Sequence, residues 1–368
     1  MTGGRRLQKR RGRTLLCGLI IILSGLWLNG KALATGATRI ITDMKGRQVQ
    51  VPDPLNRIAL FGGPTGQIAY ILGARDQLCA ITNSIKASEL VQRMDPSIRD
   101  LPAPRTTAGH INIESLILAS PQLVIAGDLD GSIVEKKTDI PVAYLESSMS
   151  HGFDLLKQEM RFYAKVFHKE DRAERYIEYL DSILGLIHSR VQDIPEHARK
   201  VVFNGYSPNH LVTLGGDTFM DQRIQAAGCG NAARGLTTGG KKEGLHVGLD
   251  EVSMEKVLVW DPDILVIDFG KPEEVYADPQ WQSLKAVKTR QVFLQPVGVF
   301  IWDRPTAESA VLYPLWLAKK AYPERFEDIN LLNEVKRFYG EIMDFPLTDA
   351  EADTLLDAGY GMNYNIRR

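Results

Sequence analysis

One sequence pattern occurs twice in the chain, and its two copies align without a gap. The first copy, "NIESLILASPQLVIA", covers residues 112–126, and the second, "SMEKVLVWDPDILVI", covers residues 253–267. Each copy has a polar residue followed two positions later by a glutamate, Glu114 or Glu255, and then an apolar run, a proline and a short β-prone run. Glu255 lies as far from Glu114 as Pro262 lies from Pro121, so the offset is constant. Such a duplication predicts two structural units with the same local plan.

Each copy predicts a short helix followed by a buried strand. Asn112 can cap the helix, and Glu114 then lies in the first turn, where the helix dipole favours a carboxylate. Pro121 ends the helix, and "LVIAG" has the character of a buried strand. The residues expected on the buried face of this helix are Ile113, Leu116 and Ile117.

The segments around the two copies extend the plan to alternating strands and helices. Two short runs flanking Lys45-Gly46-Arg47 predict a hairpin. Strands are expected at 57–63, 76–82, 140–146, 201–207 and 290–296, with a helix over 65–74. This alternation is the signature of parallel α/β units, so the fold class predicted is α/β, with two Rossmann-like lobes and a cleft between them.

A long amphipathic helix is expected between the two lobes. Apolar residues recur at helical spacing from Ala173 to Val191, about 19 residues or roughly 28 Å. The sequence "HKED" separates this helix from a shorter one before it. We therefore predict an N-terminal lobe over 35–152, a helical connector over 153–195 and a C-terminal lobe over 196–368. One long helix is a stiff joint, so only small tilts between the lobes are expected.

The segment 1–34 has the pattern of a secretory signal peptide. Six basic residues precede the apolar run of residues 14–28, and Ala32-Leu33-Ala34 forms a cleavage site. The alternative is a retained membrane anchor, although about 15 apolar residues are fewer than the roughly 20 that a spanning helix needs. Cys17 lies at the start of the apolar run, where a lipid-attachment cysteine is not expected. Cleavage is therefore predicted after Ala34, with export to the periplasm.

Removing this segment changes the charge of the chain and its cysteine count. The segment holds seven basic and no acidic residues, so 37 basic and 45 acidic residues remain, a net charge of −8. An acidic surface argues against nucleic acid as a partner. The two remaining cysteines, Cys79 and Cys229, fall in different halves of the duplication. Two buried thiols are therefore expected rather than a disulfide.

The chain resembles a known family through a set of segments in a fixed order. They are "ITDMKGRQVQVPDPLNRIA", "NIESLILASPQLVIAG", the central helix, "SMEKVLVWDPDILVI" and "PVGVFIWDRPTAESAVLYPLWLAKKAYPERF". With these segments the chain is similar to the class III periplasmic solute-binding proteins of ABC importers. The resemblance implies a binding protein without enzymatic activity or cofactor, which carries a metal chelate to a permease and contacts the inner membrane only through it. A ferric siderophore is the first expectation, while cobalamin, haem and nickel or cobalt chelates stay open.

The resemblance also implies a role for the duplicated glutamates. By their position in the motif, Glu114 and Glu255 are the residues, one per lobe, that dock onto arginines of the permease. Such charge pairs fix register and steer encounter more than they add affinity. The alternative is that each glutamate only complements the dipole of its own helix.

The ligand is expected in the cleft, beyond the carboxyl ends of the strands. The candidate contacts are Thr65 and Gln67 in "GGPTGQ", Tyr206 and His210 in "NGYSPNH", and Trp302 and Arg304 in "GVFIWDRPT". Trp302 offers a flat aromatic face and Arg304 a planar cation, which suits an anionic chelate or a macrocycle. The alternative is that Trp302 belongs to the core and Arg304 to a structural turn with Asp303.

Other functions have weaker support in the sequence. "GGPTGQ" matches neither common phosphate-loop pattern. The seven histidines are scattered without metal-ligand spacing, so direct ligation of a metal by His110 or His210 has little support. The chain has no G-x-S-x-G motif. An exported two-lobed enzyme and a membrane-tethered accessory protein remain the alternative functions.

Overall fold

The computed structural model describes residues 1, 37–62, 66–106, 108–146, 152–205, 207–239 and 249–357. The chain divides into residues 1–36 and the compact unit of residues 37–368, to which the following description applies. Apart from Met1, the predicted signal peptide lies outside the described residues. Within the described ranges, no helix combines the length and the apolar character needed to cross a bilayer.

The compact unit begins with the predicted hairpin. Strand β1 (Thr38–Thr42) pairs antiparallel with β2 (Gln48–Pro52). Gly46 adopts a φ of 78° in the turn, a conformation that glycine takes without strain. The hairpin prediction is therefore confirmed.

The N-terminal lobe contains a four-stranded parallel sheet with the order β4-β3-β5-β6. The strands are β3 (Ile58–Leu60), β4 (Leu78–Ala80), β5 (Leu123–Ala126) and β6 (Val142–Tyr144). The helices of this part are α1 (Gln67–Ile71), α2 (Asn83–Ala87), α3 (Glu89–Met94), α4 (Ile113–Leu118) and α5 (Asp128–Lys137). Every strand residue is buried, as expected for short apolar runs covered on both faces.

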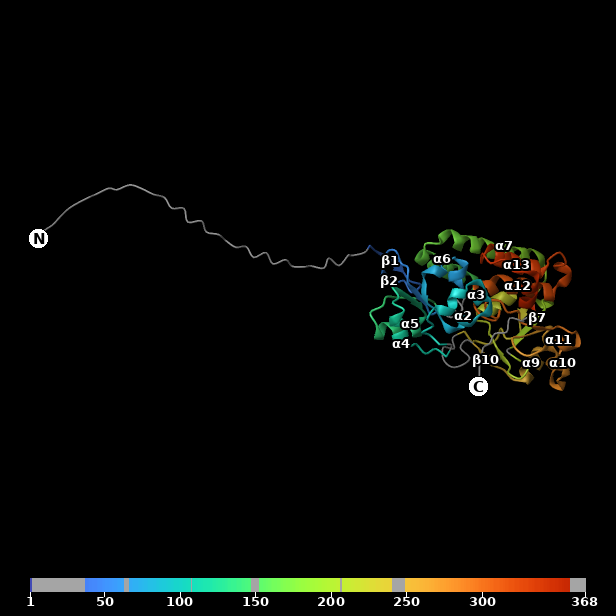
Figure 1. Cartoon of the computed structure of the whole chain (residues 1–368). Coiled ribbons are helices and arrows are strands. Elements are labelled where there is room, and N and C mark those ends of the chain that lie inside the picture. Colours follow the sequence, from blue (N-terminus) through green and yellow to red (C-terminus); the bar gives the residue numbers. More distant parts are fainter. Residues whose placement is uncertain are drawn as a thin grey trace. The chain divides into compact units, whose positions relative to one another are not determined.

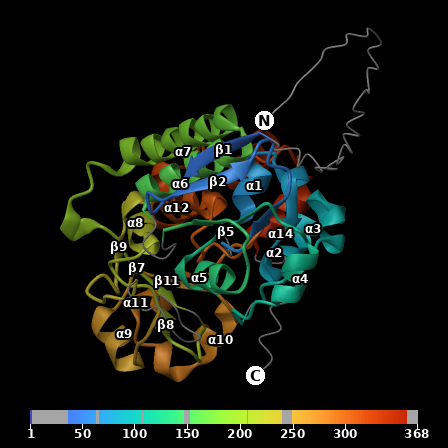
Figure 2. The same cartoon turned by 90° about the vertical axis from the view of Figure 1, so that its left-hand side faces the viewer.

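Two consecutive helices form the predicted connector. Helix α6 (Phe153–Phe167) ends at His168, whose left-handed φ of 55° reverses the chain, and α7 (Glu170–Val191) follows with 22 residues. Both the long helix and the break before it are confirmed. In the two views α7 runs along the upper side of this unit, above α4, α5 and α9 (Figures 1 and 2).

The C-terminal lobe repeats the parallel sheet with the order β12-β11-β7-β9. Its strands are β7 (Val201–Gly205), β9 (Gly230–Asn231), β11 (Ile264–Ile267) and β12 (Val292–Leu294), while β8 (Val212–Thr213) pairs antiparallel with β10 (Asp250–Glu251). The helices are α8 (Phe219–Ala226), α9 (Met254–Trp260), α10 (Pro272–Ala277), α11 (Lys285–Lys288), α12 (Ala307–Ala321), α13 (Leu331–Glu341) and α14 (Asp349–Leu356). The predicted α/β class with two lobes is confirmed.

The hydrophobic core shows the duplication at the level of single residues. On β5, Leu123 and Ile125 enter a large core shared by both lobes, whereas Val124 and Ala126 enter a smaller cluster of the N-terminal lobe. On β11 the same alternation holds: Ile264 and Val266 enter the shared core, and Leu265 and Ile267 enter a cluster of the C-terminal lobe. Because the shared core joins the two sheets, the lobe boundaries at 152 and 196 stay predictions.

One expectation for the duplicated helix is wrong. Leu116 is fully buried, but Ile113 is only half-buried and Ile117 is 52% exposed. Helix α4 has six residues and ends just before Ser120, which adopts a φ of 48°. A helix of fewer than two turns presents a narrow face to the core, and Leu116 alone fills it.

The two cysteines are buried free thiols, as predicted. Cys79 lies in β4, and Cys229 lies just before β9. Burial raises the pKa of Cys79 to about 11 and that of Cys229 to about 12. Neither thiol is therefore a reactive thiolate at neutral pH.

Candidate functional site

The helices α4 and α9 carry the duplicated glutamates at equivalent places. The side chain of Asn112 caps α4 by accepting the N–H of Ser115 at 2.9 Å, and Ser253 caps α9 by accepting the N–H of Lys256 at 3.3 Å. Glu114 and Glu255 are both exposed in the first turn that follows. The structure thus presents the duplicated carboxylate of each lobe to solvent.

The environment of Glu255 favours its ionised form. A hydrogen bond with the Ser253 hydroxyl, together with a backbone N–H, lowers the pKa of Glu255. An ionised, exposed carboxylate can steer a basic partner toward the surface.

Two of the predicted ligand residues, Thr65 and Tyr206, lie outside the described residues. A third, Gln67, is fully buried at the start of α1. Its side-chain amide donates to Glu308 Oε2 at 2.9 Å, and its Oε1 accepts the N–H of Glu308 at 3.0 Å. In this structure Gln67 therefore joins the N-terminal lobe to α12 and does not face solvent.

The structure places Trp302 in the core. The side chain is 1% exposed and belongs to the core shared by the two lobes. Its indole N–H donates to Glu308 Oε1 at 3.3 Å. The exposed aromatic face expected from the sequence is absent at this residue, because the ring packs inward to satisfy a buried acceptor.

Glu308 is the residue at the centre of this network, and sequence reasoning did not find it. It also accepts the hydroxyl of Tyr339 at 2.6 Å and the N–H of Val299 at 3.0 Å. Burial raises the pKa of Glu308, although the hydrogen bonds from Tyr339 and Trp302 oppose that effect. The packing is tight, because a Cβ added at Gly298 would clash with Glu308 Oε1.

Arg304 lies near the carboxyl edge of the C-terminal sheet. Its side chain is partly exposed and forms an ion pair with Asp303. Asp268 follows β11 directly, and its Oδ1 accepts the amide of Asn204 at 3.3 Å. Burial and the charge of nearby Asp303 raise the pKa of Asp268. The pairing of Arg304 with Asp303 matches the structural-turn alternative, while its exposed part can still meet an anion.

His210 occupies a tight turn after β7. Its backbone N–H and C=O pair with those of Ser207 at 3.1 and 3.2 Å, and the residue is half-buried. Across the ranges that the structure describes, no three His, Cys, Asp or Glu residues come together in an arrangement that could hold a metal. Ligand binding by His210 stays a prediction.

A small pocket lies between the connector and the C-terminal lobe. It is lined by Gly152, Phe153, Leu156, Phe219, Gln222, Arg223, Pro305 and Ala310, and its volume is about 10 Å³. That volume is comparable to one water molecule. Arg223 donates to the carbonyl oxygens of Arg304 and Thr306 at 2.8 and 3.0 Å, and burial lowers its pKa to about 9. Arg223 therefore holds the turn that contains Arg304.

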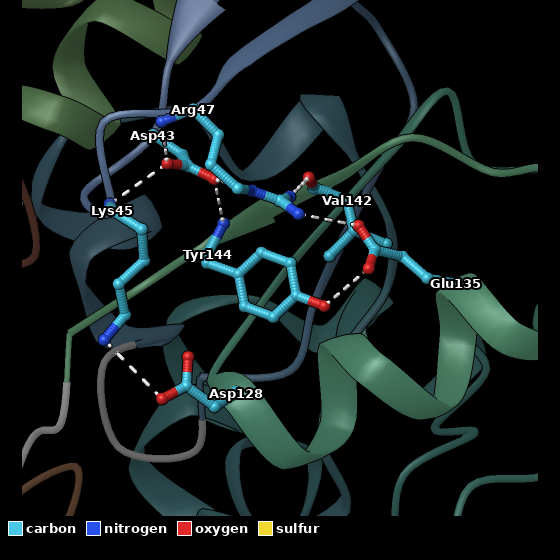
Figure 3. Close-up of polar contacts among 7 residues, drawn as sticks. All are labelled: Asp43, Lys45, Arg47, Asp128, Glu135, Val142 and Tyr144. Carbon is cyan, nitrogen blue, oxygen red and sulfur yellow. Dashed lines mark hydrogen bonds and ion pairs between the residues drawn. The ribbon is translucent and has the colours of Figure 1, made fainter.

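A second polar cluster lies at the strand ends of the N-terminal lobe. Figure 3 shows the buried Asp43 accepting hydrogen bonds from the backbone of Tyr144 and from the Arg47 side chain, at 3.1 and 2.9 Å. Lys45 extends from the same hairpin to Asp128 at 3.5 Å (Figure 3). It also pairs with Glu146 at 2.9 Å. The sequence analysis did not single out this cluster, although the alternation of charge and glycine in "DMKGR" marks the turn.

The comparisons with known proteins agree with this architecture. A family model described as periplasmic binding protein matches residues 58–296. The chain is 26% identical over 343 residues to the molybdate-binding protein MolA of Haemophilus influenzae, covering 86% of this chain and 94% of that protein. It is 22% identical over 287 residues to an iron-uptake system-binding protein of Bacillus subtilis, covering 73% and 83%. A solved structure of the Haemophilus protein with bound molybdate matches with a TM-score of 0.71 at 25% identity, covering 84% of this chain and 99% of that one.

Proposed function

The chain belongs to the periplasmic binding protein family, and from this premise we propose that it is the solute-binding component of an ABC importer. It captures a solute between its two lobes and delivers it to a membrane permease. The observation that carries this proposal is the duplication itself, which presents the exposed carboxylates of Glu114 and Glu255 on two equivalent short helices. A partner with two similar halves fits such a pair of anchors.

The solute we propose is a small tetrahedral oxyanion of the molybdate type. The relative named for molybdate covers nearly the whole chain. Two features of this structure support a small anion over a large conjugated chelate. Trp302, the residue expected to stack on a macrocycle, is buried in the core. Arg304 supplies a planar cation at the sheet edge, which suits oxyanions.

A ferric chelate is the second candidate solute. It is the first expectation from the sequence, and the iron-uptake relative supports it at 22% identity. Export to the periplasm through cleavage after Ala34 belongs to the same proposal, and mass spectrometry of the periplasmic protein tests it by the mass of a chain that starts at Thr35.

The test is a binding panel on the purified chain without residues 1–34. Isothermal titration and thermal shift are measured with molybdate, tungstate, sulfate and phosphate, and then with ferric siderophores, haem and cobalamin. Molybdate or tungstate should bind, and sulfate serves as the matched tetrahedral control. Binding of a siderophore but no oxyanion would select the second candidate, and binding of neither class would contradict both.

The variant Arg304→Ala sharpens that panel. A charged hydrogen bond to a partly buried anion is worth about 1.5–3 kcal/mol, which corresponds to roughly ten- to a hundredfold in affinity. Arg304→Ala should therefore weaken solute binding by this factor and leave the fold intact. Arg234→Ala is the matched control, because Arg234 is an exposed arginine of the same lobe. Unchanged affinity in Arg304→Ala would move the site to other loops.

A further inference from the structure

The last turns of α4 and α9 expose apolar side chains that the proposed function has not used. Apart from Met1, the large apolar side chains exposed in the described part of the chain are Ile40, Ile117, Leu118, Leu129, Leu258 and Val259. Four of these belong to the last turns of α4 and α9. Single exposed apolar residues are ordinary, but a concentration on two related helices needs an explanation.

The exposed residues occupy equivalent positions in the duplication. Leu118 and Val259 are equivalent positions of the two copies and are 83% and 80% exposed. Ile117 and Leu258 correspond in the same way and are 52% and 37% exposed. In each helix the preceding residue, Leu116 or Val257, is fully buried in the cluster of its own lobe. Both helices thus bury one apolar residue and expose the next two.

The backbone ends both helices at equivalent positions, just after the exposed pairs. Ser120 and Asp261 are equivalent positions with φ values of 48° and 40°, and each is followed by a proline. A left-handed residue before proline stops the helix at that point. Side-chain contacts then fix each end: Arg57 donates to the carbonyl oxygen of Ser120 at 3.0 Å, and the Asp261 carboxylate accepts the N–H of Lys285 at 2.8 Å.

The apolar pairs share a helix face with the duplicated glutamates. Leu118 follows Glu114 by four residues, and Val259 follows Glu255 by four residues. Residues at this spacing lie next to each other on a helix surface. Each lobe therefore presents a carboxylate beside an exposed apolar side chain, and in both views α4 and α9 lie below α7 (Figures 1 and 2).

We propose that Ile117–Leu118 and Leu258–Val259 are two equivalent apolar anchors for the importer's membrane permease, an inference that rests on the proposed function. Each half of the permease surface would offer an apolar pocket next to a basic side chain. Burial of the apolar side chains supplies binding free energy, while the charge pairs at Glu114 and Glu255 supply register. The equal spacing in both lobes fits a partner composed of two similar halves.

The test uses the variants Leu118→Ser and Val259→Ser, singly and together, with Leu129→Ser as the matched control. Leu129 is 71% exposed on α5, and the equivalent position in the second half of the chain is Gly270, so it has no apolar copy. Affinity for the complete importer in lipid nanodiscs is measured for each variant. Each single variant should bind about tenfold more weakly and the double variant about a hundredfold or more, whereas Leu129→Ser should stay within about twofold.

Solute affinity and the melting temperature should be unchanged in all of these variants, because the substituted side chains face solvent. Normal importer binding by the double variant would overturn this inference alone. If the wild type sediments as a dimer and the double variant as a monomer, the anchors bind a second copy of the chain. If the wild type binds importer-free nanodiscs and the double variant does not, the anchors bind lipid. The dimer result and the lipid result would each overturn the inference. A wild type that binds no importer would overturn the proposed function as well.

Discussion

The last residues of β5 and β11 mark the point at which the residue-by-residue correspondence between the two lobes ends. From Asn112 to Ala126 and from Ser253 to Ile267, the caps, buried positions and strand alternation match at one constant offset. One residue later the N-terminal lobe has Gly127, which begins α5, and the C-terminal lobe has the buried Asp268.

Two buried carboxylates, Asp43 in the N-terminal lobe and Asp268 in the C-terminal lobe, have pKa values shifted in opposite directions. Burial of Asp43 would raise its pKa, but the hydrogen bonds from Arg47 and Tyr144 outweigh it, so the pKa lies below its usual value. In the C-terminal lobe, burial and the proximity of Asp303 raise the pKa of Asp268. The duplicated segments face a partner that we propose to have two similar halves. We propose that the strand ends face a single solute, so the two lobes are free to differ there.

The largest predicted effect breaks the network that joins the lobes. Glu308→Ala would leave the side-chain donors of Gln67, Trp302 and Tyr339 buried without their acceptor. We expect a loss of about 3–5 kcal/mol in the free energy of unfolding, measured by urea denaturation. Glu308→Gln keeps one acceptor oxygen and should lose clearly less. A loss below about 1 kcal/mol in Glu308→Ala would contradict the role of this network.

A second prediction concerns Glu159, a buried acid of α6 that has no counterpart in the duplication. Burial raises its pKa to about 8. Between its ordinary value and about pH 8, the unfolded chain releases the proton while the folded chain keeps it, so this group lowers stability as the pH rises. Glu159→Gln does not titrate and should therefore be more stable than wild type by roughly 2–4 kcal/mol near pH 8.

The gain in Glu159→Gln should disappear below about pH 4.5, where both states of the wild type hold the proton. Unfolding curves at several pH values measure this difference. Glu114→Gln is the matched control because Glu114 is exposed, and its stability should follow that of the wild type. An equal stability difference for Glu159→Gln at every pH would contradict the raised pKa.

The smallest of these predictions concerns the N-terminal cluster in Figure 3. The lowered pKa of Asp43 adds stability that is present above its unfolded pKa and is lost as the pH falls through its folded pKa. Asp43→Asn should cost about 1–3 kcal/mol at neutral pH, and the cost should shrink in acid. Lys45→Ala is the control: its ion pairs are partly exposed, so it should cost less than about 1 kcal/mol. A loss of stability in Asp43→Asn that grows in acid would contradict the lowered pKa of Asp43.

The local elements could be predicted from the sequence because local patterns specify them. A signal within a few residues of sequence specifies each of these elements: the hairpin at Gly46, the helix–strand pairs around Pro121 and Pro262, and the break at His168. The exposure of Ile117 could not be found this way, because helical spacing says which residues share a face but not how wide the buried face is.

The contacts of the candidate site depend on residues far apart in the chain. Trp302 lies in the loop that follows strand β12, and its burial depends on Glu308 and Gln67, which is 241 residues from Glu308. The sequence held one signal for the role of Glu308. Thr306 caps α12, and Glu308 is an acid in the first turn of this largely apolar helix, which favours a buried acceptor. The duplicated glutamates were found because the two copies of the motif align without a gap in the sequence.

The central claim is that the duplicated helices serve a membrane importer and not the solute site. The most direct measurement compares solute affinity and cellular uptake for Glu114→Ala, Glu255→Ala and the double variant Glu114→Lys with Glu255→Lys. Each alanine variant should keep partial uptake, and the double lysine variant should lose nearly all of it, because like charges would then meet at both docking points. Solute affinity should stay at the wild-type value throughout. Normal uptake by the double lysine variant, or weakened solute binding in either alanine variant, would contradict the account.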